Sequence, residues 1–490
     1  MAEKTVADYL YKYAEETPEK LAVISGDEEA SYRELSFLAL GYASFLKAKG
    51  FNKGDIAVIR ASQTLSYVVA YLGVHTAGGV VASAEKNVPT EAIVSIVKAV
   101  GAKIVISTEG AEFPLEGVLS ISSSDILSDA QSTDYAEFIL PDEDDSADIL
   151  FTTGTTGASK GVELSHKALV ATAENLIYGC GYRKDTKIIV PGPLNHANPI
   201  RKLLATIVNG STICILNGMT DIKAFYTALD DKESTVACCL PPAAIRTLFT
   251  LTGDKLGEYA DRIDFIESAT APLPEPDKLR LSRLLPNTRL YNNYGSSEAA
   301  SVCMYDYNAN PGKTGCIGKM MPKSEVIIVD DDRKVIASSK DHMGYLACRG
   351  DVVMKGYINE PDLTAAVLSD GVVYTNDVGY IDDEGFVYIV GRADDVINVG
   401  GLKVAPAEVE EAALAIGIID DCICIPVENP ITGQALKLLV VMKEGEEFSP
   451  KAFTAFLQTK LEGYKVPTKY EKVEMVERTY NGKLNRKAYR

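Results

Sequence analysis

Apolar residues at helical spacing alternate with short apolar runs of strand length along the first 140 residues of the chain. The spacing predicts helices over residues 6–16, 32–49, 65–77 and 91–100, and strands over residues 21–25, 56–60, 79–83 and 102–107. The first helix ends before Pro18, and Gly50 closes the second. Strands and helices that take turns in this way favour an α/β fold with a mostly parallel sheet.

The distribution of charge changes from about residue 391 onwards. The protein has 490 residues and a formal net charge of −19. Residues 395–490, however, carry 13 basic and 14 acidic side chains, and the last 26 residues carry 8 basic and 3 acidic ones. A small, locally basic unit beside a large acidic body indicates a separate C-terminal domain placed against an anionic ligand.

Composition excludes several classes of protein. An acidic chain gains little from a polyanion, so nucleic acid is not expected as a main partner. The nine cysteines lack paired zinc-ligand spacing, and their odd number does not suit a disulfide framework, so we expect reduced, buried thiols in a cytoplasmic protein. The four histidines are too dispersed to indicate a metal cluster. No signal peptide and no membrane span are predicted, because no uncharged apolar run reaches about 18 residues.

A segment rich in glycine and threonine follows a short apolar strand at residues 149–151. It reads TTGTTGASKG over residues 152–161. The glycines allow a tight turn with inward N–H groups, the threonines add hydroxyl donors and the lysine adds a positive charge, an inventory that suits a polyphosphate. The candidate residues are Thr152, Thr153, Gly154, Thr155, Thr156, Gly157 and Lys160. The acidic run at residues 142–148 is expected to be a solvated loop.

This segment resembles the phosphate loop of the acyl-adenylate-forming enzymes, which include acyl-CoA and aryl-CoA synthetases, stand-alone adenylation domains and beetle luciferases. Ala158 and Ser159 stand where the family usually has a proline before the lysine. The resemblance extends over nearly the whole chain. It implies an α/β fold with a large N-terminal domain of mostly parallel sheets with packed helices, and a small, mobile α+β C-terminal domain.

Residues 291–298, YNNYGSSE, are similar to the family's adenine and magnesium segment. A tyrosine ring offers a stacking face for adenine, and a carboxylate is a hard ligand for Mg²⁺ that is shared with phosphates. The resemblance implies Mg²⁺ coordination by Glu298. It implies ATP or AMP contacts by Asn292, Asn293, Tyr294, Gly295 and Ser297. A weaker match at residues 268–273 places Ala271 on the other side of the adenine.

Residues 374–379 resemble the family's ribose segment. In that segment the carboxylate of Asp377 would accept hydrogen bonds from both ribose hydroxyls, each worth about 1.5–3 kcal/mol. Arg392, further along the chain, would reach the ribose or a phosphate of the same nucleotide.

Residues 391–404 resemble the hinge of the family and the loop that follows it. The resemblance implies that Asp394 is the pivot between an N-terminal domain of residues 1–393, which binds the adenylate and the acid, and a mobile domain of residues 394–490. Gly400 and Gly401 would leave room for the pantetheine arm of coenzyme A.

The tail at residues 479–486 looks like the family's terminal lysine motif, in which Lys483 would bridge the acid and the α-phosphate. His196 stands where acyl-acid and aryl-acid members have a histidine, so we expect it at the carboxylate pocket. Lys483, His196 and Glu298 are thus the predicted catalytic residues. No match was found to the aspartate of amino-acid adenylation domains, which disfavours amino acids as substrates. Arg201 and Arg246 could lie near the pocket and pair with a second carboxylate of the substrate, but a place on the surface is expected for both.

The predicted reaction joins a carboxylic acid to ATP with Mg²⁺, releases pyrophosphate, and transfers the acyl group from acyl-AMP to coenzyme A. Three alternatives stay open: transfer to a separate acyl carrier protein, light-producing oxidation of the adenylate, and non-catalytic nucleotide binding. The segment around His196 is polar and the chain has no tryptophan. Both features favour a small or medium acid, aromatic or short-chain, over a long alkyl chain.

Overall fold

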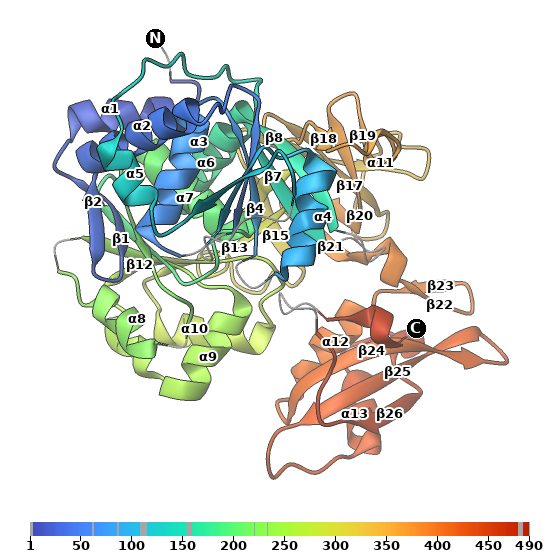
Figure 1. The fold of residues 1–490 in the computed structure, drawn as a ribbon. Coiled ribbons are helices and arrows are strands. Elements are labelled where there is room, and N and C mark those ends of the chain that lie inside the picture. Colours follow the sequence, from blue (N-terminus) through green and yellow to red (C-terminus); the bar gives the residue numbers. More distant parts are fainter. Residues whose placement is uncertain are drawn as a thin grey trace.

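The computed structural model describes residues 3–60, 63–85, 88–107, 115–153, 159–219, 221–232, 234–478 and 484–489. For Thr152, Thr153, Ser159 and Lys403 it describes the backbone alone. Figure 1 shows a large N-terminal body, coloured blue to orange, and a small C-terminal body in orange and red. Within the described ranges, every helix is too short or too polar to cross a membrane.

Seven strands of the described chain form the first sheet of the N-terminal body. In spatial order they are β18 (Gly356–Tyr357), β8 (Ser159–Ser165), β7 (Ser146–Thr153), β4 (Val80–Ala84), β3 (Ile56–Arg60), β5 (Ile104–Ser107) and β6 (Leu119–Ser122). The strands from β7 to β6 pair in parallel, and β8 returns antiparallel beside β7. The strands predicted at residues 56–60, 79–83 and 102–107 are therefore confirmed.

Seven helices cover this sheet or separate it from the second one. They are α1 (Val6–Glu16), α2 (Tyr32–Ala48), α3 (Leu65–Thr76), α4 (Thr90–Val100), α5 (Ile126–Ser132), α6 (His166–Cys180) and α7 (Ala197–Asn209). The four predicted helices are confirmed to within one residue at each end. The first begins with a capping box, in which the Thr5 side chain accepts the Asp8 N–H and the Asp8 carboxylate accepts the Thr5 N–H.

The second sheet runs through fourteen strands of the described chain. Its main path is β16 (Ser324–Val329), β17 (Gly344–Gly350), β20 (Val372–Ile381), β21 (Val387–Arg392), β15 (Cys316–Met320), β14 (Ala300–Asp306), β13 (Arg289–Ser296), β12 (Ile263–Ser268), β11 (Thr235–Cys239), β9 (Thr186–Val190), β10 (Thr212–Ile215), β1 (Leu21–Ser25) and β2 (Glu28–Ser31), with β19 (Leu368–Ser369) beside β20. Short helices accompany it: α8 (Ile222–Leu229), α9 (Pro242–Thr252), η1 (Lys255–Tyr259), α10 (Glu275–Leu284) and α11 (Pro361–Val367).

The direction of pairing changes within this sheet. The strands from β1 to β13 pair in parallel, whereas the strands from β13 to β21 and on to β16 are antiparallel. The prediction of a mostly parallel sheet came from the first 140 residues, where helices connect the strands. β13 ends at Ser296 and β14 begins at Ala300, a connection too short for the crossover that parallel strands need.

Alternating residues on the strands hold the layers together. On β3, Ile59 faces the central core and Val58 packs with α4 on the outer face. On β9, Val190 faces the central core and Ile189 packs with α8, α9 and α10. The central core also takes residues from α1, α2, α3, α6 and α7. The N-terminal body therefore has two sheets with helices between them and helices on both outer faces, which confirms the predicted α/β fold.

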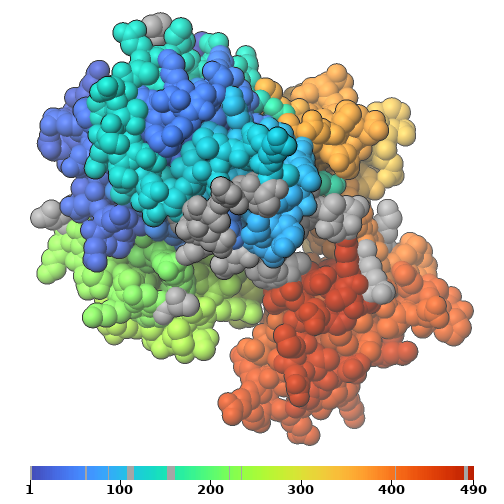
Figure 2. All heavy atoms as spheres, in the orientation of Figure 1, coloured from blue at the N-terminus to red at the C-terminus, as the bar shows by residue number. Residues whose placement is uncertain are grey.

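The C-terminal body has a sheet and a hydrophobic core of its own. Its elements are η2 (Ala393–Asp395), β22 (Ile397–Val399), β23 (Leu402–Val404), α12 (Pro406–Leu414), β24 (Ile419–Asn429), β25 (Gly433–Met442), α13 (Pro450–Leu457), η3 (Gly463–Lys465), β26 (Lys469–Lys472) and η4 (Arg486–Tyr489). Figure 2 shows it as a lobe that projects from the larger body, and α12 lies against β21 and α10.

All nine cysteines are buried and carry free thiols. This agrees with the predicted reduced, buried thiols. Burial raises the pKa of the Cys238, Cys422 and Cys424 thiols, among others, so these cysteines behave as small apolar side chains rather than as nucleophiles.

The acidic run at residues 142–148 is only partly the solvated loop that the sequence predicts. Asp148, its last residue, lies on β7 and is 1% exposed. Its carboxylate accepts a hydrogen bond from the Tyr71 hydroxyl at 2.7 Å and lies 3.0 Å from His75 Nε2. The expectation is therefore wrong for Asp148, because the run continues into a strand whose polar side chain finds buried partners on α3.

His166, at the start of α6, predicts how stability depends on pH. Its ring nitrogens are buried and have no hydrogen-bond partner among the described residues. Burial, helped by nearby His75, lowers the pKa of His166 to about 3. As pH decreases, this histidine takes up a proton near pH 6.5 in the unfolded chain but only near pH 3 in the folded chain. The free energy of unfolding therefore falls between about pH 6.5 and 3. This group contributes at most about 1.4 kcal/mol per pH unit to that fall.

Urea unfolding of His166→Phe between pH 7 and 4 measures this contribution, and we expect a shallower loss of stability than in the wild type. His342 is exposed, so His342→Gln serves as the control and should keep the wild-type slope. An equal slope in His166→Phe and the wild type would contradict the prediction.

Candidate active site

The predicted phosphate loop connects β7 to β8. Gly154, Thr155, Thr156 and Gly157 lie outside the described residues, as do the side chains of Thr152 and Thr153. Lys160 is described and pairs with Thr152 across the hairpin. Its Nζ lies 5.3 Å from the centroid of the Tyr357 ring on β18. The lysine of the loop is therefore held over the electron-rich face of an aromatic ring.

Glu298 presents its carboxylate to the same tyrosine. The Tyr357 hydroxyl donates to Glu298 Oε1 at 2.8 Å, and burial together with Glu298 raises the pKa of Tyr357, which keeps its proton. Ser296 Oγ accepts the N–H of Glu298 at 3.1 Å and fixes the turn after β13. Tyr357 thus links Lys160 to Glu298, through its ring on one hand and its hydroxyl on the other. The sequence analysis missed Tyr357, which is 59 residues from Glu298 and stands in no recognisable motif.

A second polar cluster brings together three predicted nucleotide residues. The Tyr294 hydroxyl donates to Asp377 Oδ2 at 2.5 Å, and Arg392 Nη1 donates to Asp377 Oδ1 at 3.3 Å. Asp377 and Arg392 are direct neighbours across β20 and β21. Burial and the adjacent carboxylate raise the pKa of Tyr294, so its hydroxyl stays a donor. A carboxylate has about four acceptor positions, which leaves Asp377 able to accept further hydrogen bonds.

Other residues of the same segment have structural tasks. Asn293 donates through Nδ2 to Glu267 Oε1 at 2.8 Å and to Ser301 Oγ at 3.1 Å, and it is buried. The Asn293 amide therefore points to partners inside the protein, and the nucleotide contact that the resemblance implies for this residue stays a prediction. A Cβ on Gly295 would lie 1.5 Å from the Ala300 carbonyl oxygen, so the close approach that this glycine permits is to its own hairpin.

Three other predicted contacts remain predictions. Asn292 and Ser297 are half-buried beside the clusters described above, and Ala271 is half-buried in the loop after β12. The residue before Ala271 is strained: Thr270 has a φ of 77°, a left-handed conformation that costs a residue with a side chain about 1–3 kcal/mol.

His196 stands at the N-terminal end of α7. It is the N-cap residue, but its side chain does not cap the helix. Burial lowers the pKa of His196, with a smaller opposing effect from Glu85. The imidazole is therefore neutral at pH 7 and can donate or accept a hydrogen bond without adding charge.

The two arginines expected on the surface are both engaged. Arg201 is buried on α7, and its Nη2 donates to the Ser296 carbonyl oxygen at 2.8 Å. Burial lowers the pKa of Arg201 to about 10. The surface expectation is therefore wrong for Arg201, since the polar carbonyl at the end of β13 satisfies its guanidinium. Arg246 is half-buried and donates through Nε to Asp277 at 2.9 Å.

A buried charged cluster lies under α7 that the sequence analysis did not find. Lys202 and Glu267 are both 0% exposed, and Lys202 Nζ donates to Glu267 Oε1 at 3.0 Å and to Asn198 Oδ1 at 2.8 Å. Asn198 Nδ2 in turn contacts Cys239 Sγ at 3.2 Å. Burial lowers the pKa of Lys202, but Glu267 and the neighbouring Cys239 and Cys180 together more than offset this, and the net pKa is raised. The lysine is therefore charged.

The predicted hinge lies between the two bodies of the chain. Asp394 belongs to η2, and its Oδ2 accepts a hydrogen bond from Asn376 Nδ2 at 2.9 Å. Beyond it, Gly400 and Gly401 form the two-residue turn between β22 and β23, with φ of 61° and 91°. Two positive φ values in succession suit glycine in a tight hairpin. The pivot and pantetheine roles stay predictions.

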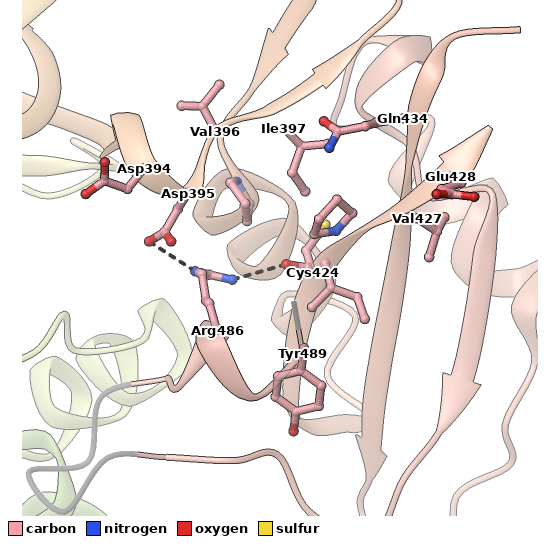
Figure 3. Close-up of a pocket in the computed structure, with 13 residues that line it drawn as sticks. Asp394, Asp395, Val396, Ile397, Cys424, Val427, Glu428, Gln434, Arg486 and Tyr489 are labelled. Atoms are coloured by element: carbon pink, nitrogen blue, oxygen red, sulfur yellow. Dashed lines mark hydrogen bonds and ion pairs between the residues drawn. The ribbon is translucent and has the colours of Figure 1, made fainter. Parts of the chain in front are cut away.

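Lys483 lies outside the described residues, but the chain on either side of its segment is anchored. Arg486 binds Glu410 through two bonds of 2.6 and 2.7 Å, donates to the Cys424 carbonyl oxygen at 3.1 Å and lies 3.5 Å from Asp395. Figure 3 shows Arg486 between Asp395 and Cys424, in the wall of a cavity of about 460 Å³. The tail is thereby tied to the residue that follows Asp394.

Two sequence models match the chain. The model of the AMP-binding enzyme family matches residues 10–358, and that of the AMP-binding enzyme C-terminal domain matches residues 408–483. The protein belongs to the AMP-binding enzyme family. The predicted acyl-adenylate-forming enzyme is thus confirmed at the level of the family, and the C-terminal match ends at Lys483.

Several known AMP-binding enzymes resemble the chain over its length. A long-chain-fatty-acid–CoA ligase from Bacillus subtilis (strain 168) is 27% identical over 99% of this chain and 94% of that protein. A 4-coumarate–CoA ligase 3 from Arabidopsis thaliana is 25% identical over 98% and 90%. The ATP-bound structure of MatB from Rhodopseudomonas palustris has a TM-score of 0.90 at 23% identity, covering 100% of this chain and 98% of that one, which shows the same fold.

The tail anchor of this AMP-binding enzyme makes a prediction about stability. Arg486→Met leaves the buried Glu410 carboxylate without its charged partner, which costs about 3–5 kcal/mol. We expect this loss in the unfolding of the C-terminal domain, followed by hydrogen exchange of the amides of β24 and β25. Arg478 makes a comparable contact with Asp421 at 2.7 Å, but at the surface. The control Arg478→Met is therefore expected to cost about 0.2–1 kcal/mol, and equal losses in the two variants would contradict the prediction.

Proposed function

We propose that this AMP-binding enzyme is an acid–thiol ligase that activates a carboxylic acid with ATP and transfers the acyl group to coenzyme A. The observation that carries the proposal is the end of β13. Near this end Tyr294 and Arg392 both donate hydrogen bonds to Asp377 and form one cluster. Glu298 accepts a hydrogen bond from Tyr357, whose ring contacts Lys160, and these residues form the other cluster. One cluster suits a ribose and the other suits phosphates with a metal ion. The two relatives named as CoA ligases support the same reaction class.

The nucleotide would lie across the two clusters. Asp377 has acceptor capacity left for the ribose hydroxyls, and Arg392 beside it supplies a positive charge. Lys160 and the threonine-rich loop would bind the β- and γ-phosphates. Ala271, Asn292 and Ser297 would line the adenine and the sugar.

The donor set at Glu298 fits Mg²⁺. Among the described residues, no group of three histidine, cysteine or acidic side chains gathers around one point, so a metal ion here would take most of its ligands from phosphates and water. Mg²⁺ binds in this way, through one or two carboxylates and substrate phosphates. Glu298 would hold the ion, which neutralises the charge of the leaving pyrophosphate.

The first half-reaction needs no general base, because the acid is ionised at neutral pH. A carboxylate oxygen attacks the α-phosphorus, and the bond from that phosphorus to the pyrophosphate oxygen breaks. The residues must hold two anions together in line, which is a task of positioning and charge. Lys483 would bridge the carboxylate and the α-phosphate, and neutral His196 would orient the acid.

The second half-reaction replaces AMP by a thiol. The thiolate attacks the acyl carbon, the bond to AMP breaks, and the thiol proton passes to solvent. Rotation about Asp394 would withdraw the tail with Lys483 and bring the Gly400–Gly401 turn to the same site. A thin pantetheine arm passes more easily beside a turn that has no side chains. We also propose the cytoplasm as the location, since nine unpaired cysteines suit a reducing compartment.

Pyrophosphate release that depends on an added acid tests the proposal. The panel contains acetate, butyrate, octanoate, palmitate, benzoate and 4-coumarate, and we expect a small or medium acid to give the highest kcat/KM. Palmitate as the best substrate would contradict that expectation. ATP binding without pyrophosphate release from any acid would favour a non-catalytic nucleotide-binding module.

A second assay identifies the acceptor. Thioester formation is measured with free coenzyme A and with an isolated acyl carrier protein under equal conditions. We expect coenzyme A to react, and carrier-protein loading without a coenzyme A thioester would favour the alternative acceptor. Glu298→Gln is the matched inactive control, because it keeps the volume of the side chain and removes its charge.

A further inference from the structure

The Lys202–Glu267 cluster lies where a substrate of the proposed ligase would end. Glu267 is the residue before the last of β12, and Cys239 is the last residue of β11. Both strands are parallel members of the second sheet, and ligands of such sheets bind beyond the carboxyl ends of the strands. Asn198 and Lys202 lie in the first two turns of α7, the helix whose N-cap residue is His196. Asn293, which binds Glu267, directly precedes Tyr294.

The cluster contains acceptors that the protein does not use. Glu267 Oε1 accepts from both Lys202 and Asn293, whereas Glu267 Oε2 and Asn293 Oδ1 are buried without a hydrogen-bond partner among the described residues. The Cys239 thiol lies beside Glu267 and can donate a hydrogen bond to it, but a thiol is a weak donor and does not use the acceptor capacity of the carboxylate fully. Buried polar atoms are nearly always satisfied, so two free acceptors on linked side chains indicate a missing donor.

The cluster also has a spare donor. Lys202 Nζ carries three N–H groups and, with the described residues, makes two hydrogen bonds, to Asn198 and Glu267. A group that fills this place would therefore gain by donating one hydrogen bond and accepting another. A hydroxyl does both, while an ammonium only donates and a carboxylate only accepts.

Charge leads to the same choice. Lys202 and Glu267 neutralise each other, and Arg201 beside them is balanced by Glu298, which raises its pKa against the effect of burial. A second carboxylate or an ammonium from the substrate would add an uncompensated charge to a buried, neutral cluster, which is costly. A neutral hydroxyl adds none.

We propose that the Lys202–Glu267 cluster is the distal wall of the acid pocket, and that it selects carboxylic acids whose acyl part carries a hydroxyl group. The inference rests on the proposed ligase function and deepens it, because it names the substrate class. His196 orients the reacting carboxylate at the start of α7, and the cluster around Lys202, six residues further along the chain, recognises the far end of the molecule.

Matched acids test the proposal with the wild-type enzyme. Acid-dependent pyrophosphate release is measured for hexanoate, 6-hydroxyhexanoate, adipate and 6-aminohexanoate, and for benzoate, 4-hydroxybenzoate and terephthalate. In at least one series we expect kcat/KM for the hydroxy acid to exceed that of its unsubstituted parent by about 10-fold or more, with the dicarboxylate and the amino acid below it.

Variants of the cluster connect the preference to these residues. The double variant Lys202→Met, Glu267→Leu replaces the buried pair by apolar side chains, a change that folds are known to tolerate. We expect its ratio of kcat/KM for the hydroxy acid to that for the parent acid to fall about 10-fold. The matched control is Lys187→Met, Asp231→Leu, which removes another largely buried pair, 2.6 Å long, from the opposite face of the same sheet. It should keep the wild-type ratio.

A third variant tests the inference if the double variant folds poorly. Glu267→Asp keeps a negative charge for Lys202 but withdraws the free acceptor, so it should lower kcat/KM for the hydroxy acid alone. If kcat/KM for the hydroxy acids is no higher than for their parent acids, the inference is overturned, and the free acceptors bind trapped water instead. The proposed ligase function would not be affected by that result. An unchanged ratio in every folded cluster variant would overturn the inference as well. Absence of pyrophosphate with all acids would overturn both proposals.

Discussion

Lys483→Ala is expected to slow acyl-adenylate formation by about 100- to 1,000-fold, the loss that follows removal of one charged contact made chiefly in the transition state. Formation of the thioester from a supplied acyl-adenylate should be far less affected, because the lysine would have left the site by then. The described residues on either side of the lysine's segment contact one another. Arg478 and Leu484 pair on either side of it, and Asn485 N–H donates to the Glu477 carbonyl oxygen at 2.9 Å.

The two half-reactions are measured separately, by exchange of labelled pyrophosphate into ATP and by thioester release from the acyl-adenylate. Lys487 is exposed on the same tail, so Lys487→Ala is the matched control and should leave both rates near wild type. Equal losses of both half-reactions in Lys483→Ala would refute a lysine that acts in the first step alone.

Asp394→Pro should give the opposite pattern, with thioester synthesis reduced about 10- to 100-fold if rotation limits that step, and pyrophosphate exchange largely preserved. Proline fixes φ near −65° and disfavours the helical conformation of the residue before it. Ala393 is that residue, and it belongs to the short helix η2. The substitution would therefore hinder the change in backbone angles that a pivot residue must undergo.

Asp394→Ala separates the backbone from the carboxylate. It removes the bond from Asn376 but leaves φ free, so it should make thioester faster than the proline variant. A normal rate of thioester synthesis in Asp394→Pro would show that the domains turn about another residue.

Local patterns predicted the elements of the fold well. The helix at residues 6–16 is recognisable because Thr5 and Asp8 cap it and apolar residues recur on one face. The strands of the first sheet are short runs of valine and isoleucine between helices. The direction of the later strands was harder to predict. Pairing from β13 to β21 depends on the lengths of the connections between strands rather than on any apolar pattern.

The part of the site that the sequence missed consists of long-range polar pairs. Lys202 and Glu267 are 65 residues apart, and a single lysine in a helix is usually solvated. Asp148 belongs to an acidic run that reads as a surface loop, and Arg201 stands beside another basic residue. Their burial depends on partners from other elements, which neither composition nor periodicity reveals.

The burial of all nine thiols makes this protein convenient for optical measurements of domain movement. Maleimide dyes react with exposed thiolates, so a native chain should stay unlabelled and its own cysteines need not be removed. Ile139 on the N-terminal body is 95% exposed and Ile431 on the C-terminal body is 91% exposed. The double variant Ile139→Cys, Ile431→Cys would therefore carry a donor and an acceptor fluorophore at two chosen points, and energy transfer between them would follow the rotation during turnover.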